Sequence, residues 1–459
     1  MDLYRHISSH FIAPLWAKWE KSDYLKHIEY LKELQFLSPE EIKGIQWRKI
    51  KALLNHAYKN CSYYNELFDK IALHPDDIKT WSDLKDIPVL TKDKVRNNYK
   101  DLIAGNIDKK TLISGMTSGS TGKPLHFLAD EKGLQWARAH CVLTQQWAGW
   151  RMGEKIFAVM GIHANEKRYG IRRYLRNKLL DRICLLNTLE LDENSMFTFY
   201  ELLRRADRPF IHGFAHAIYL FAQYLEQQGL TDLHACGVMT GGMVLSNHER
   251  SLMERVFHCK VFNRYGTEEM GVIACECERH EGLHISEGNY YIEVLNGDRR
   301  TLPGQMGSLI VTDLHNHGMP FIRYQIEDMA VPSDSACSCG RTWCMIKEIA
   351  GRTSDFIITP EKKIVSGISL TDFFALIPGI IQIQIVQDRV DHLNFKIVRS
   401  EEFNDESMKR LKSIEHQFFG DKMRVSYDYV DSIPKEPRGK FRFVKSEIAK
   451  DFLGYPQYL

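Results

Sequence analysis

The sequence has no apolar stretch long enough to form a membrane-spanning helix, which needs about 20 mostly apolar residues. It also shows no apolar leader ahead of a small-residue cleavage site, so we expect a cytoplasmic protein with no transmembrane segment. A charge excess of either sign is missing too, because 61 Lys and Arg face 59 Asp and Glu and leave a net charge of +2. This balance gives no reason to expect a nucleic-acid partner.

Cysteine is sparse, with ten residues in a chain of 459, and this argues against a disulfide scaffold. The length exceeds one ordinary core, so two or three domains are expected. One local excess of positive charge consists of Lys167, Arg168, Arg172, Arg173, Arg176, Lys178 and Arg182. A solvated helix face explains such a run. A lid over an anionic substrate, or a patch for an acidic surface, is the alternative.

Helical patterns fill most of residues 1–100, with a strong helix start at Ser38, where a capping hydroxyl precedes a proline and two acids. Between about 110 and 330, apolar runs such as 155–160 alternate with helical repeats such as 214–228. This alternation predicts an α/β domain, which we place at 1–350.

The pattern changes after Gly351. Apolar residues alternate at 381–385, 393–397 and 425–429, and a polar helix is expected near 404–418. Strands around one or two helices predict a small α+β domain at 351–459.

Residues 117–124 are the most informative stretch and read Thr-Ser-Gly-Ser-Thr-Gly-Lys-Pro. Glycines and small hydroxylated residues let backbone N–H groups approach an anion closely, and Lys123 adds a mobile cation. This is the chemistry of a polyphosphate cradle. It is not a Walker loop, which would need glycine at Thr117 and a hydroxyl at Pro124. A plain surface loop has a similar composition.

Four further motifs follow in order. Residues 263–269 read Asn-Arg-Tyr-Gly-Thr-Glu-Glu after an expected strand at 260–262. An aromatic residue beside a glycine can stack on a base, and a carboxylate just beyond can hold Mg²⁺ against phosphate oxygens. A simple turn is the alternative. Asp328, expected at the end of an apolar strand, could accept both hydroxyls of a ribose or simply end that strand.

The last two motifs concern the expected domain boundary and the C-terminal domain. Residues 351–355 read Gly-Arg-Thr-Ser-Asp and lie where a hinge would absorb a rotation. Residues 434–440 read Pro-Lys-Glu-Pro-Arg-Gly-Lys, and a lysine on such a loop can be delivered into a site on another domain.

Together, these five motifs resemble the adenylate-forming superfamily of acyl-CoA synthetases over about residues 85–445. The nearest branch contains phenylacetate–CoA ligase, coenzyme F390 synthetase and CapK-like capsule-biosynthesis proteins. The compact length points to that branch, as do Cys277-Glu278-x-x-x-Gly282-Leu283-His284 and Cys337-Ser338-Cys339-Gly340-Arg341.

The resemblance implies a role for each matching position. It implies that the phosphates of ATP are held by Thr117, Ser118, Gly119, Ser120, Thr121, Gly122 and Lys123. It implies that Gly241 and Gly242 line the adenine site and that Tyr265 and Gly266 lie against adenine or the acyl site.

For the reacting groups, Glu269 matches the magnesium-binding glutamate and Asp328 the ribose-binding aspartate. Arg352 matches an arginine that touches ribose or phosphate, and Lys440 the lysine that contacts the carboxylate and the α-phosphate. Lys440, Glu269 and Lys123 are thus the expected catalytic residues. Glu268 departs from the family pattern, which has Thr or Ser there, and residues 325–327 lack the usual arginine and glycine.

Soft ligands gather in two clusters, one of Cys275, Cys277, His280 and His284 and one of Cys337, Cys339 and Cys344. Such clusters in an intracellular chain suggest a structural zinc that joins two strand–loop regions. Neither has the C-x-x-C spacing of a zinc ribbon, and free thiols with an incidental histidine are the alternative. Since the resembling branch shares these spacings, the expected ligands are Cys277, His284, Cys337 and Cys339, with the other three as substitutes.

The resemblance implies an ATP-dependent ligase that uses Mg²⁺, activates a carboxylic acid as its adenylate and releases pyrophosphate. The acyl group would then pass to coenzyme A, or to an amine or hydroxyl acceptor in polysaccharide or secondary-metabolite biosynthesis. The acyl pocket is expected at 160–165 and 212–218, including His163, His212 and His216, although a lone histidine is more often structural.

Two other functions stay open. One is a nucleotidyltransferase that leaves AMP on its substrate, as coenzyme F390 synthetase does. The other is a non-catalytic nucleotide-binding relative of the ligases. A homodimer is compatible with this branch.

Overall fold

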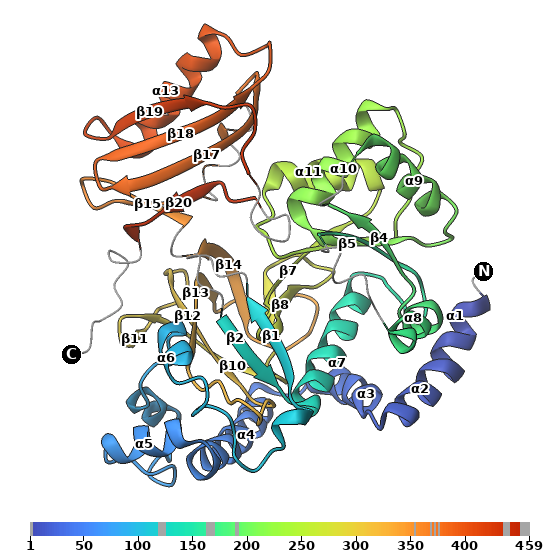
Figure 1. Ribbon diagram of the computed structural model, residues 1–459, viewed down its shortest axis with the longest axis vertical. Coiled ribbons are helices and arrows are strands. Elements are labelled where there is room, and N and C mark those ends of the chain that lie inside the picture. Colours follow the sequence, from blue (N-terminus) through green and yellow to red (C-terminus); the bar gives the residue numbers. More distant parts are fainter. Residues whose placement is uncertain are drawn as a thin grey trace.

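The computed structural model describes residues 3–117, 125–161, 170–188, 192–352, 355–367, 370, 373–374, 377–434 and 441–449. A large mixed sheet with flanking helices is followed by a separate C-terminal domain, orange to red in Figure 1. The predicted fold class, α/β with a large N-terminal and a small C-terminal domain, is confirmed. Among the described residues, no helix combines the length and the apolar character of a membrane span.

Helices form most of the first hundred residues. In order they are α1 (Leu3–Ile7), the π-helix η1 (Ser8–Ile12), α2 (Ala13–Glu20), α3 (Tyr24–Leu34), α4 (Pro39–Asn60), α5 (Ser62–Lys70), the 3-10 helix η2 (Trp81–Asp86) and α6 (Lys92–Asn97). The helix start predicted at Ser38 is confirmed. Its hydroxyl accepts the Glu41 N–H at 3.3 Å, and the Glu41 carboxylate accepts the Ser38 N–H at 2.9 Å. This reciprocal cap satisfies N–H groups that a helix start leaves unpaired.

A short 3-10 turn, η3 (Lys109–Thr111), leads into an antiparallel hairpin that precedes a parallel sheet. The hairpin pairs β1 (Ile113–Thr117) with β2 (Leu125–Ala129), and α7 (Glu131–Trp147) follows. The parallel strands are β3 (Ile156–Met160), β4 (Ile183–Asn187), β5 (Phe210–Phe214), β6 (Gly237–Gly241) and β7 (Val261–Thr267). Their order in the sheet is β4-β3-β5-β6-β7.

Helices on the faces of this sheet connect its strands, as Figure 1 shows in green. They are α8 (Ile171–Arg176), the π-helix η5 (Asn177–Asp181), α9 (Glu193–Arg204), α10 (Ala215–Gln227) and α11 (Asn247–Phe257). The strand predicted at 155–160 is β3, and the helix predicted at 214–228 is α10. Since both faces of a parallel sheet are covered, its strands are continuous apolar runs rather than alternating ones.

Beyond β7 the sheet continues with antiparallel strands in the order β7-β8-β9-β14-β13-β12-β10-β11. The strands are β8 (Gly271–Glu276), β9 (Leu283–Ile285), β10 (Tyr290–Asn296), β11 (Arg299–Arg300), β12 (Gly307–Asp313), β13 (Tyr324–Ser333) and β14 (Met345–Arg352). Leu54 of α4 and Phe68 of α5 share a buried core with Tyr324 of β13. The N-terminal helices therefore support the strand that carries Asp328.

The C-terminal domain has its own core. A small pair, β15 (Phe356–Ile358) with β16 (Ile364–Ser366), precedes a four-stranded sheet. That sheet contains β17 (Ile380–Arg389), β18 (His392–Arg399), β19 (Arg424–Tyr429) and β20 (Val444–Ser446), with α13 (Asp405–Phe419). Gly351 and Arg352 still belong to β14 of the large sheet, so we propose that the domain boundary expected near 350 follows directly after them.

Gly213 marks a close approach between two parallel strands. It pairs with Val159 of β3, and a Cβ atom at this position would lie 2.0 Å from the Val159 carbonyl oxygen. No real Cβ atom approaches an oxygen so closely, so only glycine fits without moving the strand.

We expect Gly213→Ala to lower the melting temperature, because the added methyl group overpacks the sheet, at a typical cost of about 1–3 kcal/mol. Gly170→Ala is the matched control, since a Cβ there meets nothing within 4 Å and φ is −59°. Thermal unfolding followed by circular dichroism measures both. Equal melting temperatures for the two variants would show that the strands are not packed as described.

Candidate active site

The parallel strands end at one edge of the sheet, which is where ligands bind in open α/β folds. Gly241 ends β6, and Gly242 follows it with φ of 68°, a backbone conformation that favours glycine. Tyr265 and Gly266 lie near the end of β7. These four positions, expected at the adenine or acyl site, therefore come from the ends of two neighbouring strands.

The same edge contains a topological switch point. The chain leaves β3 for β4 on one side, and it leaves β5 for β6 on the other. Such a switch point, here between the ends of β3 and β5, is the usual ligand position in open α/β sheets. The segments expected to form the acyl pocket, 160–165 and 212–218, begin at these two strand ends.

The glycine–serine stretch is described only at its flanks. Thr117 and Leu125 pair across the β1–β2 hairpin, and the Thr117 hydroxyl accepts the Leu125 N–H at 3.3 Å. Residues 118–124 lie outside the described part. The expected phosphate contacts of Ser118, Gly119, Ser120, Thr121, Gly122 and Lys123 therefore stay predictions.

Tyr265, Asp328 and Arg352 form one cluster, although β14, β9 and β8 separate β7 from β13 in the sheet. The Tyr265 hydroxyl donates a hydrogen bond to the Asp328 carboxylate. Arg352, the cross-strand neighbour of Asp328, places its Nε 3.8 Å from Asp328 Oδ1. The sheet therefore curls enough to bring three predicted site residues into contact.

Asp328 does not end its strand, and that expectation was wrong. It lies inside β13, next to a register irregularity and after Glu327, whose φ is 74°. The irregularity turns an interior strand residue toward the site, in the way that β-bulges re-aim side chains.

Burial raises the pKa of the Asp328 carboxyl above its usual value, although Arg352 and the Tyr265 hydroxyl act in the opposite direction. Burial and the nearby Asp328 charge raise the pKa of Tyr265 well above its usual value, so Tyr265 keeps its proton and donates a hydrogen bond to the carboxylate.

Gly266 explains the shape of the turn beside Tyr265. A Cβ atom at Gly266 would lie 2.1 Å from the Gly271 carbonyl oxygen, at a register shift between β7 and β8. Glu268 and Glu269 follow in the turn. Glu268 is exposed, whereas Glu269 is partly buried and accepts a hydrogen bond from the Tyr324 hydroxyl at 2.9 Å.

Contacts of Asp355 link the site to the C-terminal domain. The Asp355 carboxylate accepts the Arg352 backbone N–H at 3.1 Å and pairs with the Arg442 guanidinium at 2.6 Å. The Phe441 ring stacks on His216 of α10, with the centroids 5.9 Å apart. Lys440 lies outside the described residues, but its two successors contact Asp355 of the expected hinge motif and His216, which follows the end of β5.

The expected pocket histidines have structural partners. His212 hydrogen-bonds Arg264, and burial, with this cation nearby, lowers its pKa well below the usual value. His216 lies 2.9 Å from Glu249. His163 lies outside the described residues. We therefore assign none of the three a chemical role.

Cys277, His284, Cys337 and Cys339 converge, with their ligand atoms all within 4.8 Å of one another. The Cys277 and Cys337 sulfurs are 3.6 Å apart, and Cys339 Sγ lies 3.4 Å from His284 Nε2. Three sulfurs and one imidazole nitrogen at this spacing are a donor set that suits zinc.

The surroundings orient these groups as metal ligands. His284 Nδ1 lies 3.2 Å from the Trp343 carbonyl oxygen, so a proton on Nδ1 leaves Nε2 facing the cysteines. Backbone N–H groups of Arg279 and Arg341 point to the sulfurs of Cys277 and Cys339. Such N–H···S contacts favour thiolates.

The three substitute ligands lie elsewhere. Cys275 donates to the Glu276 carbonyl, His280 pairs with the Glu276 carboxylate at 3.1 Å, and Cys344 is exposed. The cluster therefore joins the β8–β9 hairpin to the loop before β14 through the four expected residues.

The sequence of this chain is similar to those of several known proteins. A family model described as the CapK C-terminal domain matches residues 357–447. Protein CapK of Staphylococcus aureus is 25% identical over 438 residues, which cover 93% of this chain and 94% of that protein. Phenylacetate-coenzyme A ligase of Escherichia coli strain K12 is 27% identical over 340 residues, which cover 72% of this chain and 75% of that protein.

Among solved structures, 2-hydroxyisobutyryl-CoA ligase in its postadenylation state superposes with a TM-score of 0.72 and 16% identity. The match covers 91% of this chain and 92% of that one, so the fold is shared over nearly the whole length. This chain belongs to the adenylate-forming superfamily. The sequence relatives CapK and phenylacetate-coenzyme A ligase support an adenylate-forming ligase.

Several contacts of this adenylate-forming ligase had no clear signal in the sequence. Lys92 pairs with Glu327 at 3.2 Å, and Arg442 pairs with Asp355, which lies just after the proposed domain boundary. Tyr324 and Asp355 belong to recognised motifs, yet their partners become visible only when distant segments are folded together.

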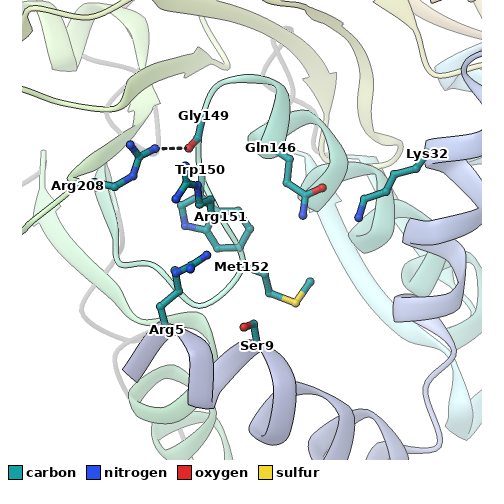
Figure 2. A pocket seen from close by; sticks show the side chains of 9 residues that line it. All are labelled: Arg5, Ser9, Lys32, Gln146, Gly149, Trp150, Arg151, Met152 and Arg208. Carbon is teal, nitrogen blue, oxygen red and sulfur yellow. Dashed lines mark hydrogen bonds between the residues drawn. The ribbon is translucent and has the colours of Figure 1, made fainter. Parts of the chain in front are cut away.

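The described residues also form a basic cavity of about 490 Å³ away from this site (Figure 2). It lies between the N-terminal helices and the segment that follows α7. Its lining includes Arg5, Lys32, Arg151 and Arg208, and Arg208 donates to the Gly149 carbonyl at 3.0 Å. Since Glu154 and Glu29 pair with Arg208 and Lys32, two of these cations are already compensated.

We expect Asp328→Asn to raise the melting temperature at neutral pH. Because the folded-state pKa of Asp328 is raised, folding is disfavoured once this group must ionise, so the penalty is present at neutral pH and disappears as pH falls through the raised pKa. Melting curves over a pH series measure the difference between variant and native protein.

Asp391→Asn serves as the contrast, because the Arg424 partner lowers the pKa of Asp391. Replacing this carboxylate by an amide should therefore lower the melting temperature at neutral pH. If Asp328→Asn destabilises the protein to the same extent at every pH, burial does not raise the pKa of Asp328 as described.

Proposed function

We propose that this chain activates a carboxylic acid as an acyl adenylate, releases pyrophosphate from ATP, and transfers the acyl group to coenzyme A or to an amine or hydroxyl acceptor. The contact between Tyr265 and Asp328, which lie 63 positions apart, is the main support. With Arg352, it brings together three positions that separate motifs had predicted, at the edge where α/β sheets bind nucleotides.

The described groups suit the two ends of a nucleotide. A buried carboxylate such as Asp328 can accept both ribose hydroxyls, and the Arg352 guanidinium compensates its charge. Tyr265 supplies an aromatic ring on which a flat base could stack. These residues would bind and orient the nucleotide rather than exchange protons with it.

The reaction itself brings two anions together, since the acid's carboxylate attacks the α-phosphorus of ATP. Charge that builds up during this attack must be compensated by cations positioned beforehand. Glu269 suits a Mg²⁺ ligand because Tyr324 orients its carboxylate while the side chain keeps some exposure. When bound, Mg²⁺ would neutralise phosphate oxygens. Lys440 would supply the second cation, and the position of Phe441 on His216 supports its delivery to the strand edge.

The acid and the acceptor are narrowed by the relatives. The Escherichia coli relative is named a phenylacetate-coenzyme A ligase, which favours an aryl acid with coenzyme A as acceptor. Protein CapK, which matches over nearly the whole chain, keeps a different acceptor open. We place the acyl group at the topological switch point, between the ends of β3 and β5.

We expect acid-dependent exchange of labelled pyrophosphate into ATP, measured over a panel of aryl, aliphatic and amino acids. Lys440→Ala should reduce the exchange about 100- to 1,000-fold, the usual effect of removing one group that stabilises transition-state charge. Lys422→Ala, on the same domain but 75% exposed and paired with Glu361, is the matched control and should leave the rate unchanged.

Product analysis separates the alternatives. Free AMP with a new thioester, amide or ester supports the proposal, whereas AMP that remains on the product indicates a nucleotidyltransferase. ATP binding without exchange for any acid of the panel indicates a non-catalytic relative. Near-normal exchange by Lys440→Ala would remove the assigned role of that lysine.

We also propose a structural zinc at Cys277, His284, Cys337 and Cys339. Tetrahedral zinc with Zn–S bonds of about 2.3 Å places two sulfurs roughly 3.8 Å apart, and the Cys277 and Cys337 sulfurs are 3.6 Å apart. The cluster is largely buried and lies at the opposite end of β14 from Asp328, since His284 pairs with Met345 and Asp328 with Arg352, which favours a structural rather than a catalytic metal.

We expect purified protein to contain about one zinc per chain, because structural zinc is retained through gentle purification. Cys339→Ser should lose the metal and lower the melting temperature, while Cys344→Ser, at the exposed neighbouring thiol, should change neither. Metal analysis by plasma mass spectrometry, together with thermal unfolding, measures both effects. Unchanged metal content in Cys339→Ser would contradict the ligand set.

A further inference from the structure

The N-terminal helical segment, α1–η1–α2, turns large apolar side chains toward solvent, whereas an ordinary surface helix buries them. Its fully or nearly fully buried side chains are small: Ser8, Ala13 and Ala17. Its exposed side chains include Ile7 (43%), Phe11 (65%), Leu15 (68%) and Trp19 (62%). A surface helix normally buries its large apolar residues and exposes polar ones. This segment therefore presents an apolar stripe away from the protein.

The stripe is nearly straight for a physical reason. Its members recur every four residues, a spacing that drifts slowly around an α-helix of 3.6 residues per turn. The π-helical η1 has i→i+5 bonds and a wider turn, which offsets part of this drift. Ile7, Phe11, Leu15 and Trp19 thus share one face over the whole segment.

Helix α8 extends the stripe sideways. It lies beside α1 and α2 in Figure 1, and Arg176 of α8 pairs with Glu20 of α2 at 3.1 Å. The Arg172 guanidinium covers the Trp19 ring at 4.8 Å. Helix α8 adds three exposed apolar side chains: Ile171 (79%), Tyr174 (60%) and Leu175 (41%). We call the surface formed by these three residues and the four stripe residues the docking face.

The two segments that form the docking face expose Lys and Arg side chains. Within the described residues 3–21 and 170–182, the exposed Lys and Arg side chains are Lys18, Lys21, Arg172, Arg173 and Lys178. The two carboxylates in these segments, Glu20 and Asp181, are partly buried and paired with Arg176. Among these described residues, no carboxylate is exposed. This explains part of the basic run at 167–182 that the ligase chemistry does not use.

We propose that the docking face binds the surface of an anionic lipid bilayer. Large apolar side chains next to Lys and Arg are the combination that lies in the membrane interface, where apolar groups enter the acyl boundary and cations meet lipid phosphates. A second copy of the chain would bring the same cations opposite these and repel. The docking would be peripheral, and it does not depend on the ligase activity.

Binding of the full-length protein to vesicles tests the proposal. We expect co-sedimentation with vesicles of phosphatidylcholine mixed with phosphatidylglycerol, little with phosphatidylcholine alone, and a decrease as salt screens the charges. Phe11→Ser should weaken the binding strongly. Arg173→Gln should weaken it about fivefold, the usual effect of one cation near an anionic surface.

Leu302→Ser is the matched control, since Leu302 is 65% exposed, as Phe11 is, but lies in the distant β11–β12 turn. It should bind as the native protein does. Equal binding to neutral and anionic vesicles, or no binding to either, would overturn the proposal. So would a monomer–dimer shift in Phe11→Ser, measured by light scattering without lipid, since it would assign this face to a second copy.

Discussion

One hydrogen bond, from the Tyr265 hydroxyl to the Asp328 carboxylate, depends on the curl of the whole large sheet. The two residues belong to strands that are far apart in sheet order, so they meet only if the intervening strands bend. The bend has local causes that are visible in the residues. Gly266 lets β7 and β8 approach closely, and the irregularity beside Asp328 turns its side chain inward. The proposed nucleotide binding at this edge would thus depend on backbone shape as much as on the charged side chains.

Local patterns predicted the elements well because each of these elements follows from its own residues. The Ser38 cap, the apolar run of β3 and the helical repeat of α10 need no tertiary information. The resemblance had favoured four of the seven soft ligands, and these four side chains converge, while their role as zinc ligands stays a proposal.

Contacts between segments far apart in the chain could not be predicted from local sequence patterns. The contacts Lys92–Glu327 and Arg442–Asp355 each join segments far apart in the chain, and nothing in the immediate sequence of one partner specifies the other. The position of Asp328 was misjudged for a related reason. A strand irregularity with positive φ at Glu327 depends on the neighbouring strands and not on the residue type. The resemblance to a known superfamily supplied the roles that composition alone could not.

The cysteine–histidine cluster has a consequence for how the nucleotide edge assembles. Cys277 and Cys337 are 60 positions apart, and the chain between them contains β9, β10, β12 and β13, with both Tyr324 and Asp328. A metal held by the cluster would tie the two ends of this loop together, and such a tie removes much of the freedom of the unfolded chain. Metal binding would then favour the closed loop before any nucleotide binds. Folding of the proposed nucleotide site would therefore depend on the availability of a metal ion that does not contact that site.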